Sequence, residues 1–235
     1  MAIKALVFDV FGTLVDWRTS IARASEKHLA PLGLNTNWFE FADAWRAEYD
    51  PAMATIRNGQ RGFCRLDELH RNNLDLILSR WGWHQVDNNT RQQLNQAWHH
   101  LDAWSDVSEA MKLLRQQFLL APCSNGHIAL MVHLARHNDW HWDAVLGAEI
   151  AQDYKPQARV YQATAEALGL EHDQTMMVAA HSSDLAAAAQ AGLKTAFIGR
   201  PDEHGPGLGE SKATVEVDFE ADNLLSLAHV LAKTK

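Results

Sequence analysis

The sequence has little cysteine and no cluster of basic residues, and both shortages narrow the possible functions. Only two cysteines, Cys64 and Cys123, occur among 235 residues. Their separation fits neither a zinc-ligand motif nor a disulfide-rich scaffold, which favours a reducing cytoplasm. The formal net charge is −8, and no run of lysine or arginine interrupts the acidic balance. Nucleic acid is therefore not an expected partner.

The sequence also lacks a long apolar segment. A membrane-spanning helix needs about 18 or more consecutive apolar residues, and no stretch approaches this length. The short apolar run at the N-terminus ends at Asp9, which is not the pattern of a secretory signal. We therefore expect a water-soluble cytoplasmic protein that does not bind a membrane.

Apolar residues make up 47% of the chain, and they follow two sequence patterns that alternate along it. Short runs of strand length are separated by helical patterns of about ten residues. This alternation predicts an α/β fold in which helices cover both faces of a parallel sheet. We expect strands at residues 3–8, 118–123, 144–150, 175–180 and 195–198. The expected helices of this part are 108–117, 128–137, 158–168, 184–191 and 224–232.

Residues 15–99 interrupt the alternation because they carry helical patterns only. The expected helices there are 19–29, 38–56, 66–81 and 88–99. A helical insertion after the first strand would cover the ends of the strands. We therefore predict two domains: an α/β core of residues 1–14 and 100–235 and a helical cap of residues 15–99. The glycine-rich stretch 202–212 is predicted to be a loop.

Polar residues follow the predicted strands at the points where the strands end. Asp9 follows the first strand, Ser124 and Asn125 follow the second, Lys155 comes after the third and Asp184 after the fourth. The carboxyl ends of parallel strands meet at one edge of the sheet, which is where open α/β sheets bind ligands. A carboxylate displayed there can attack a substrate and form an ester. We therefore expect these side chains to form one site with Asp9 as nucleophile.

These motifs resemble those of the haloacid dehalogenase superfamily, and the resemblance covers essentially the whole chain. The matching segments are 9–14 (Asp-Val-Phe-Gly-Thr-Leu), 124–126 (Ser-Asn-Gly), 154–156 (Tyr-Lys-Pro) and Asp184. Within the superfamily the chain is most similar to the (S)-2-haloacid dehalogenases. Phe11 stands where those enzymes have an aromatic residue, Arg46 matches their halide-binding arginine, and the run from Lys155 to Tyr161 also matches. The resemblance implies a Rossmann-like core with an inserted helical cap.

The resemblance also implies a mechanism without metal or cofactor. Asp9 would displace halide from carbon 2 of a short 2-haloacid, and water would then cleave the ester, giving a 2-hydroxy acid of inverted configuration. Lys155 would keep Asp9 ionised. Asp184 would position or deprotonate the water, aided by Lys155, Tyr161 and Thr13.

Substrate binding is assigned in the same way. Ser124 and backbone N–H groups near Val10 and Phe11 would hold the substrate carboxylate, while Arg46 and Asn125 would receive the halide. The apolar wall would consist of Phe11, Tyr49 and Phe63. Relatives are commonly dimers, so a homodimer is expected.

The chain departs from the family pattern after the fourth strand. His181 replaces an amide and Ser183 replaces an aromatic residue found in many relatives. His181 is either a new donor or base in the pocket or a structural histidine. A compact halide site would favour small halides, so haloacetates, including fluoroacetate, are candidate substrates.

Two other functions remain open at this stage. A Mg²⁺-dependent phosphohydrolase would use Asp9 and Asp184 as metal ligands, but it normally needs an acid two residues after the nucleophile. Phe11 occupies that position and cannot protonate a leaving oxygen, whereas halide leaves without a proton. A binding protein that kept the fold and lost turnover is the third possibility, because fold alone does not fix function.

Overall fold

The sheet is the centre of the fold. The computed structural model describes residues 2–233 and contains six strands in the order β3-β2-β1-β4-β5-β6. The strands are β1 (Ala5–Phe8), β2 (Leu119–Ser124), β3 (Leu146–Gly147), β4 (Thr175–Ala179), β5 (Lys194–Ile198) and β6 (Phe219–Ala221). All neighbouring pairs are parallel. The predicted Rossmann-like parallel sheet is confirmed, and β1 lies at its middle, where the strand order reverses.

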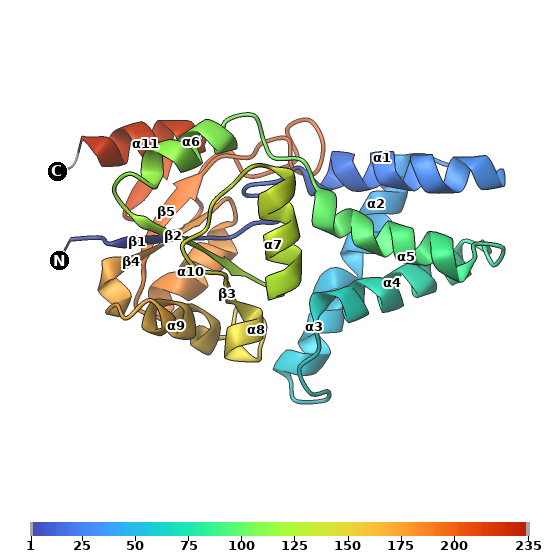
Figure 1. Ribbon diagram of the computed structural model, residues 1–235, viewed down its shortest axis with the longest axis horizontal. Helices are drawn as coiled ribbons and strands as arrows, with labels where there is room; N and C mark the ends of the chain where they lie inside the picture. The colour runs from blue at the N-terminus through green and yellow to red at the C-terminus, as the bar shows by residue number, and fades with distance from the viewer. Residues whose placement is uncertain (1, 234–235) are drawn as a thin grey trace.

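Helices cover both faces of the sheet, as expected for strands buried on both sides. Along β1, Leu6 and Phe8 face one apolar layer and Val7 faces the other. The first layer contains α6 (Val107–Leu114), α7 (Ile128–His137) and α11 (Leu224–Ala232), and the second contains α9 (Ala158–Ala167) and α10 (Ser182–Gln190). Figure 1 shows α6 and α11 on one side of the strands and α9 and α10 on the other.

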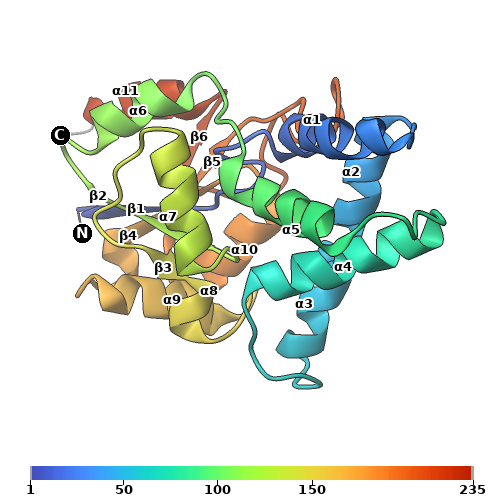
Figure 2. The same ribbon diagram turned by 45° about the vertical axis from the view of Figure 1, so that its right-hand side comes forward.

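Between β1 and β2 the chain forms helices only. They are α1 (Trp17–Leu29), η1 (Ala30–Leu32), α2 (Trp38–Ala47), α3 (Tyr49–Arg57), α4 (Leu66–Arg80), α5 (Asn88–Ala97) and η2 (Trp98–His100). In Figures 1 and 2 these helices lie to one side of the sheet, beyond the carboxyl ends of its strands. The helical insertion agrees with the sequence; its status as a separate domain stays a prediction. Among residues 2–233, no helix combines the length and the apolar character needed to cross a bilayer.

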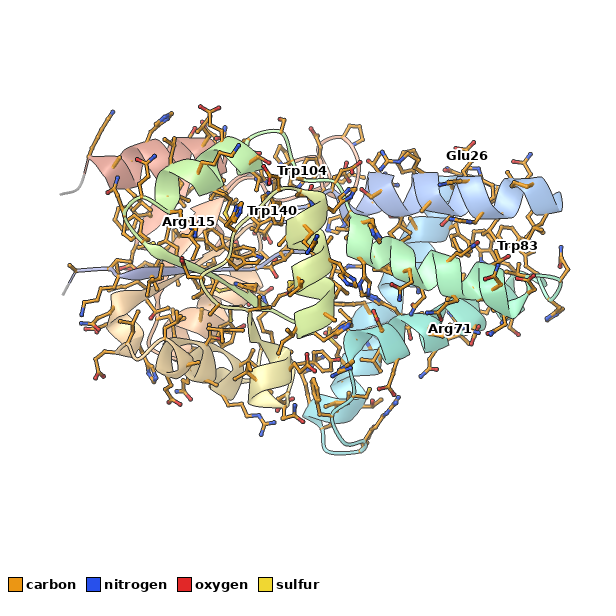
Figure 3. The ribbon with its side chains drawn as sticks, in the orientation of Figure 1. Glu26, Arg71, Trp83, Trp104, Arg115 and Trp140 are labelled. Atoms are coloured by element: carbon orange, nitrogen blue, oxygen red, sulfur yellow. The ribbon has the colours of Figure 1, made fainter. Side chains whose placement is uncertain are left out.

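Aromatic side chains pack together in the part of the helical insertion that is remote from the sheet, and they continue the core on one face of the sheet. Phe41 stacks on Trp83 with ring centroids 5.6 Å apart and meets the edge of Trp81 at 5.2 Å. Trp38 contacts Trp83 at 6.2 Å. Figure 3 labels Trp83 at the end of the insertion that is remote from the strands. Trp38 and Phe41 therefore serve packing within the insertion.

Two predicted elements differ from the structure, and one strand was not predicted. The apolar run 144–150 forms only the two-residue strand β3, because the chain continues at once into α8 (Ala148–Ala151). The predicted helix 38–56 is two helices, α2 and α3, which meet at Glu48. The strand β6 at the sheet edge was missed because it carries no apolar run: Glu220 is exposed, and the residues on either side of it are only partly buried.

Candidate active site

Asp9 lies directly after the central strand and is 7% exposed. Its backbone N–H donates to Val178 O in β4 at 3.0 Å, so the ladder of the sheet fixes its position. Oδ1 accepts a hydrogen bond from Lys155 Nζ at 2.9 Å, and Oδ2 accepts one from Thr13 Oγ1 at 2.7 Å. The carboxylate therefore has one orientation, held by an ammonium on one oxygen and a hydroxyl on the other.

Lys155 connects Asp9 to a second carboxylate. Its Nζ lies 2.5 Å from Asp184 Oδ2, at the start of α10, and Tyr161 OH donates to Asp184 Oδ1 at 2.6 Å. Both oxygens of Asp184 are thus engaged. Five residues that the sequence placed in the catalytic site lie together in the structure: Asp9, Thr13, Lys155, Tyr161 and Asp184.

His181 lies between Asp9 and a buried glutamate. Its Nδ1 is 3.1 Å from Asp9 Oδ2 and its Nε2 is 2.8 Å from Glu203 Oε2. Glu203 is 3% exposed and also accepts a hydrogen bond from Trp17 Nε1 at 3.0 Å. A Cβ atom on Gly12 would lie 2.0 Å from Glu203 Oε1, so glycine at this position leaves the space that the glutamate fills.

The pKa of Asp9 lies well below its usual range. Burial alone would raise this pKa, but the charge of Lys155 and the hydrogen bond and charge of His181 outweigh it. Burial likewise lowers the pKa of Lys155, yet the carboxylates of Asp184 and Asp9 raise it above its ordinary value. Asp9 is therefore an ionised carboxylate at neutral pH, as a nucleophile must be.

His181 is a cation while Asp9 is ionised. Burial lowers its pKa, but the hydrogen bonds and charges of Asp9 and Glu203 raise it to about 10. The pKa of Glu203 is lowered, because the favourable contacts with His181 exceed the effect of burial. While Asp9 is ionised, His181 therefore donates to both carboxylates and cannot accept a proton.

A pocket of about 300 Å³ opens in front of Asp9. Arg46, from α2, lies with its guanidinium carbon 3.8 Å from the ring centre of Tyr49, and its Nη1 is buried without a hydrogen-bond partner among the described residues. Asn125 Oδ1 accepts from the backbone N–H of Lys155 at 2.8 Å. The lining residues are Asp9, Phe11, Arg46, Tyr49, Asp50, Asn125, Lys155, Pro156, Tyr161, His181, Ser183 and Asp184.

The Val10 side chain packs in the apolar core, and the role expected of the backbone N–H groups near Val10 and Phe11 stays a prediction. Two residues whose side chains the sequence assigned to substrate binding do not line this pocket. Ser124 is fully buried, with its hydroxyl accepting from the N–H of Gly126 at 3.0 Å. Phe63 packs instead against Tyr154, with ring centroids 5.4 Å apart. Thr13 is also absent from the lining, but it reaches the site through Asp9.

The sequence missed Glu203 and Asp50. Glu203 lies in the stretch 202–212, whose glycines indicate a loop and nothing more. The loop is fixed by the neighbouring Arg200, which pairs with Asp106 through two bonds of 2.9 Å and donates to Thr13 O. No local pattern signals this role. An exposed Asp50 at the pocket mouth pairs with Arg57 at 2.8 Å.

A divalent cation in this pocket would use the carboxylates of Asp9 and Asp184. Each of them already has Lys155 Nζ within 2.9 Å, so their negative charges face an ammonium. The arrangement suits a reaction that needs an ionised, oriented carboxylate and donors for an anion.

Comparison with known proteins agrees with this geometry. The sequence profile of the haloacid dehalogenase-like hydrolases matches residues 3–192. The structure of a defluorinating L-2-haloacid dehalogenase is 39% identical, with a TM-score of 0.94 over 98% of this chain and 95% of that one. That of another L-2-haloacid dehalogenase is 40% identical, with a TM-score of 0.92 over 98% and 99%. A (S)-2-haloacid dehalogenase of Pseudomonas putida is 24% identical over 84% of this chain and 85% of its own. The chain thus belongs to the haloacid dehalogenase-like hydrolases and, within them, to the family of the (S)-2-haloacid dehalogenases.

Proposed function

We propose that this protein hydrolyses short (S)-2-haloacids and haloacetates to 2-hydroxy acids. The observation that carries the proposal is the pair of groups that line the same pocket: an ionised Asp9 and the guanidinium of Arg46, whose Nη1 has no hydrogen-bond partner among the described residues. The first supplies a nucleophile and the second a donor for a departing anion. The names of the similar proteins point to the same reaction.

In the first half-reaction an Asp9 oxygen attacks carbon 2 of the substrate from the side opposite the halogen. A carbon–oxygen bond forms, the carbon–halogen bond breaks, and the halide leaves with the electron pair. Arg46 and the amide NH₂ of Asn125 meet the developing anion, since the Asn125 carbonyl is already used by Lys155. No proton is needed, which suits a pocket with Phe11 two residues after the nucleophile.

The second half-reaction depends on His181. Esterification removes the negative charge of Asp9, which is one of the two partners that hold the pKa of His181 at about 10. The pKa then falls, the imidazolium releases its proton to solvent, and neutral His181 takes a proton from the attacking water while Glu203 stabilises the new cation. His181 returns this proton to the oxygen of the product as the ester bond breaks. The second proton of the water, left on the Asp9 carboxyl group, then passes to His181, so that Asp9 is again a carboxylate and His181 again a cation. The proton released earlier accounts for the acid formed with the halide.

This assignment differs from the expectation that Asp184 positions or deprotonates the water. Both oxygens of Asp184 are occupied by Lys155 and Tyr161, whereas His181 contacts the reacting carboxylate itself. We assign Asp184 the role of orienting Lys155. A pocket of about 300 Å³ restricts the substrates to short acids, and haloacetates, fluoroacetate among them, fit that limit.

The test is halide release by metal-stripped protein from (S)-2-chloropropionate and from the haloacetates. A matched assay follows phosphate release from a generic phosphoester with Mg²⁺. We expect halide without metal and no phosphate. A single turnover in isotope-labelled water should leave the label on Asp9 and not in the product, because the product oxygen comes first from the carboxylate. Phosphate release alone, or label in the product of the first turnover, would overturn the proposal.

A further inference from the structure

A second histidine–carboxylate cluster lies where the helical insertion meets the helices of the sheet. Asp67 stands at the beginning of α4, His99 lies in η2, and His127 directly precedes α7. His133 follows on α7. Figures 1 and 2 show α7 between the sheet and the insertion, beside the end of α5 that leads into η2. None of these residues lines the pocket of Asp9.

Two buried histidines and the partly buried Asp67 converge on one point. His99 Nε2 lies 2.9 Å and 3.0 Å from the two oxygens of Asp67, and His127 Nε2 lies 3.4 Å from Asp67 Oδ2. One ligand atom from each residue falls within 4.8 Å of the other two. His99 is 2% and His127 3% exposed. Two imidazole nitrogens and a carboxylate oxygen at this spacing are a common donor set for a divalent transition metal ion.

We propose that Asp67, His99 and His127 bind a divalent transition metal ion such as Zn²⁺. The ion would take Nε2 of both histidines and one carboxylate oxygen, and water would fill the fourth position of a tetrahedral site. Each neutral imidazole would bind the ion through Nε2 and carry its single proton on Nδ1.

His133 supports this assignment because it contacts the far nitrogen of one ligand. His99 Nδ1 lies 2.7 Å from His133 Nδ1. A histidine that binds a metal through one nitrogen usually donates the other N–H to a neighbour, which fixes its tautomer. His133 is positioned to accept that proton when His99 Nε2 binds the ion. The Nδ1 of His127, by contrast, is buried without a hydrogen-bond partner among the described residues.

The proposed ion would join three segments that meet only in the folded protein. Asp67 belongs to the helical insertion, His99 to its return to the sheet, and His127 to the loop after β2. Since the cluster is separate from the pocket, the ion would fasten the insertion to the sheet layer and take no part in the chemistry at Asp9.

The test is a titration of metal-stripped full-length protein with Zn²⁺ in competition with a chromophoric chelator. We expect one ion per chain. Co²⁺ should give the visible absorption of a low-coordinate site with nitrogen ligands. The double variant His99→Gln/His127→Gln should lose affinity by more than the roughly 10–100-fold that loss of an outer partner costs. His133→Ala should fall within that 10–100-fold range.

Two control variants show whether the ion binds at this cluster or elsewhere on the protein. His84→Gln removes an exposed histidine distant in sequence from the cluster and should leave the affinity unchanged. Asp9→Asn should also leave the Zn²⁺ affinity unchanged. A fall in affinity in this variant would show that the ion binds at the catalytic carboxylates. Circular dichroism without metal shows whether each variant is folded. If the double variant is unfolded, the Co²⁺ spectrum of the wild type and the Zn²⁺ affinity of His133→Ala test the proposal instead. Absence of stoichiometric binding by the wild type, or binding that survives in the folded double variant, would overturn the proposal.

Discussion

The two histidine–carboxylate clusters of this protein contain similar groups in different surroundings. The pocket cluster consists of Asp9, His181 and Glu203, and the junction cluster consists of Asp67, His99 and His127. In the pocket cluster one imidazole lies between two carboxylates, with its two nitrogens at 3.1 Å and 2.8 Å. In the junction cluster two imidazoles point at one carboxylate.

We infer from this difference that the number of histidines per carboxylate, and whether a substrate can reach them, matter more for the role of a cluster than the residue types alone. A histidine with two carboxylates is held as a cation, and it becomes a base when one carboxylate is esterified. Two histidines with one carboxylate leave the donor atoms that a divalent cation uses. The pocket beside Asp9 admits a substrate, whereas the junction cluster lies between helices and joins them.

The largest expected effect is that of Asp9→Asn. The amide is not a nucleophile, so the rate of halide release should fall by about a thousandfold or more, in the range seen when a catalytic nucleophile is removed. Halide release with an ion-selective electrode measures this. The Zn²⁺ affinity of the junction cluster should not change. If most of the activity is retained, Asp9 is not the nucleophile.

The next effect concerns His181→Gln. This variant should release one equivalent of halide and then stall, because the water lacks a base; the steady-state rate should fall by about 10²–10⁴-fold. Intact mass spectrometry should find the substrate acid attached to Asp9. Glu203→Gln should slow the same step less. Accumulation of the ester in Asp184→Asn but not in His181→Gln would assign the base to Asp184.

A smaller effect should appear in the junction cluster. Zn²⁺ at one hundred times its dissociation constant should stabilise the folded protein by about 2.7 kcal/mol. For a chain of this size this corresponds to a rise of roughly 5–10 °C in Tm. Calorimetry of the wild type and of Asp67→Asn measures it, and the variant should show no rise. Equal rises in both would place the ion elsewhere.

The last prediction is a pH dependence of stability from His181. Its pKa is about 10 in the folded protein against an ordinary value of 6.5. Its stabilisation is therefore complete below pH 6.5 and is lost as the pH rises through about 10. Asp9 and Glu203 have lowered pKa values and stay ionised over this interval. Urea unfolding at pH 6 and pH 10 should show a greater loss in the wild type than in His181→Gln; equal losses would contradict the assignment.

Much of the site followed from local sequence. Asp9 and Asp184 were placed correctly because an apolar run that ends in a polar residue marks the carboxyl end of a strand, and parallel strands bring those ends together. Lys155 was found from its motif, although α8 stands between β3 and this residue. The resemblance supplied Arg46, which no local rule distinguishes from a surface arginine. The homodimer and the cytoplasmic location stay predictions.

The sequence by itself determined the alternating elements, the helical insertion and the position of the candidate nucleophile Asp9, because periodicity and chain direction are local properties. Only the tertiary structure decided the partners of His181 and the junction cluster. Glu203 reaches Trp17 across 186 residues of sequence, and His99 meets Asp67 across 32. Such contacts depend on how the helices pack and on where a glycine leaves space. Side chains that meet across long sequence separations leave no pattern in the order of the residues, so sequence reasoning does not find them.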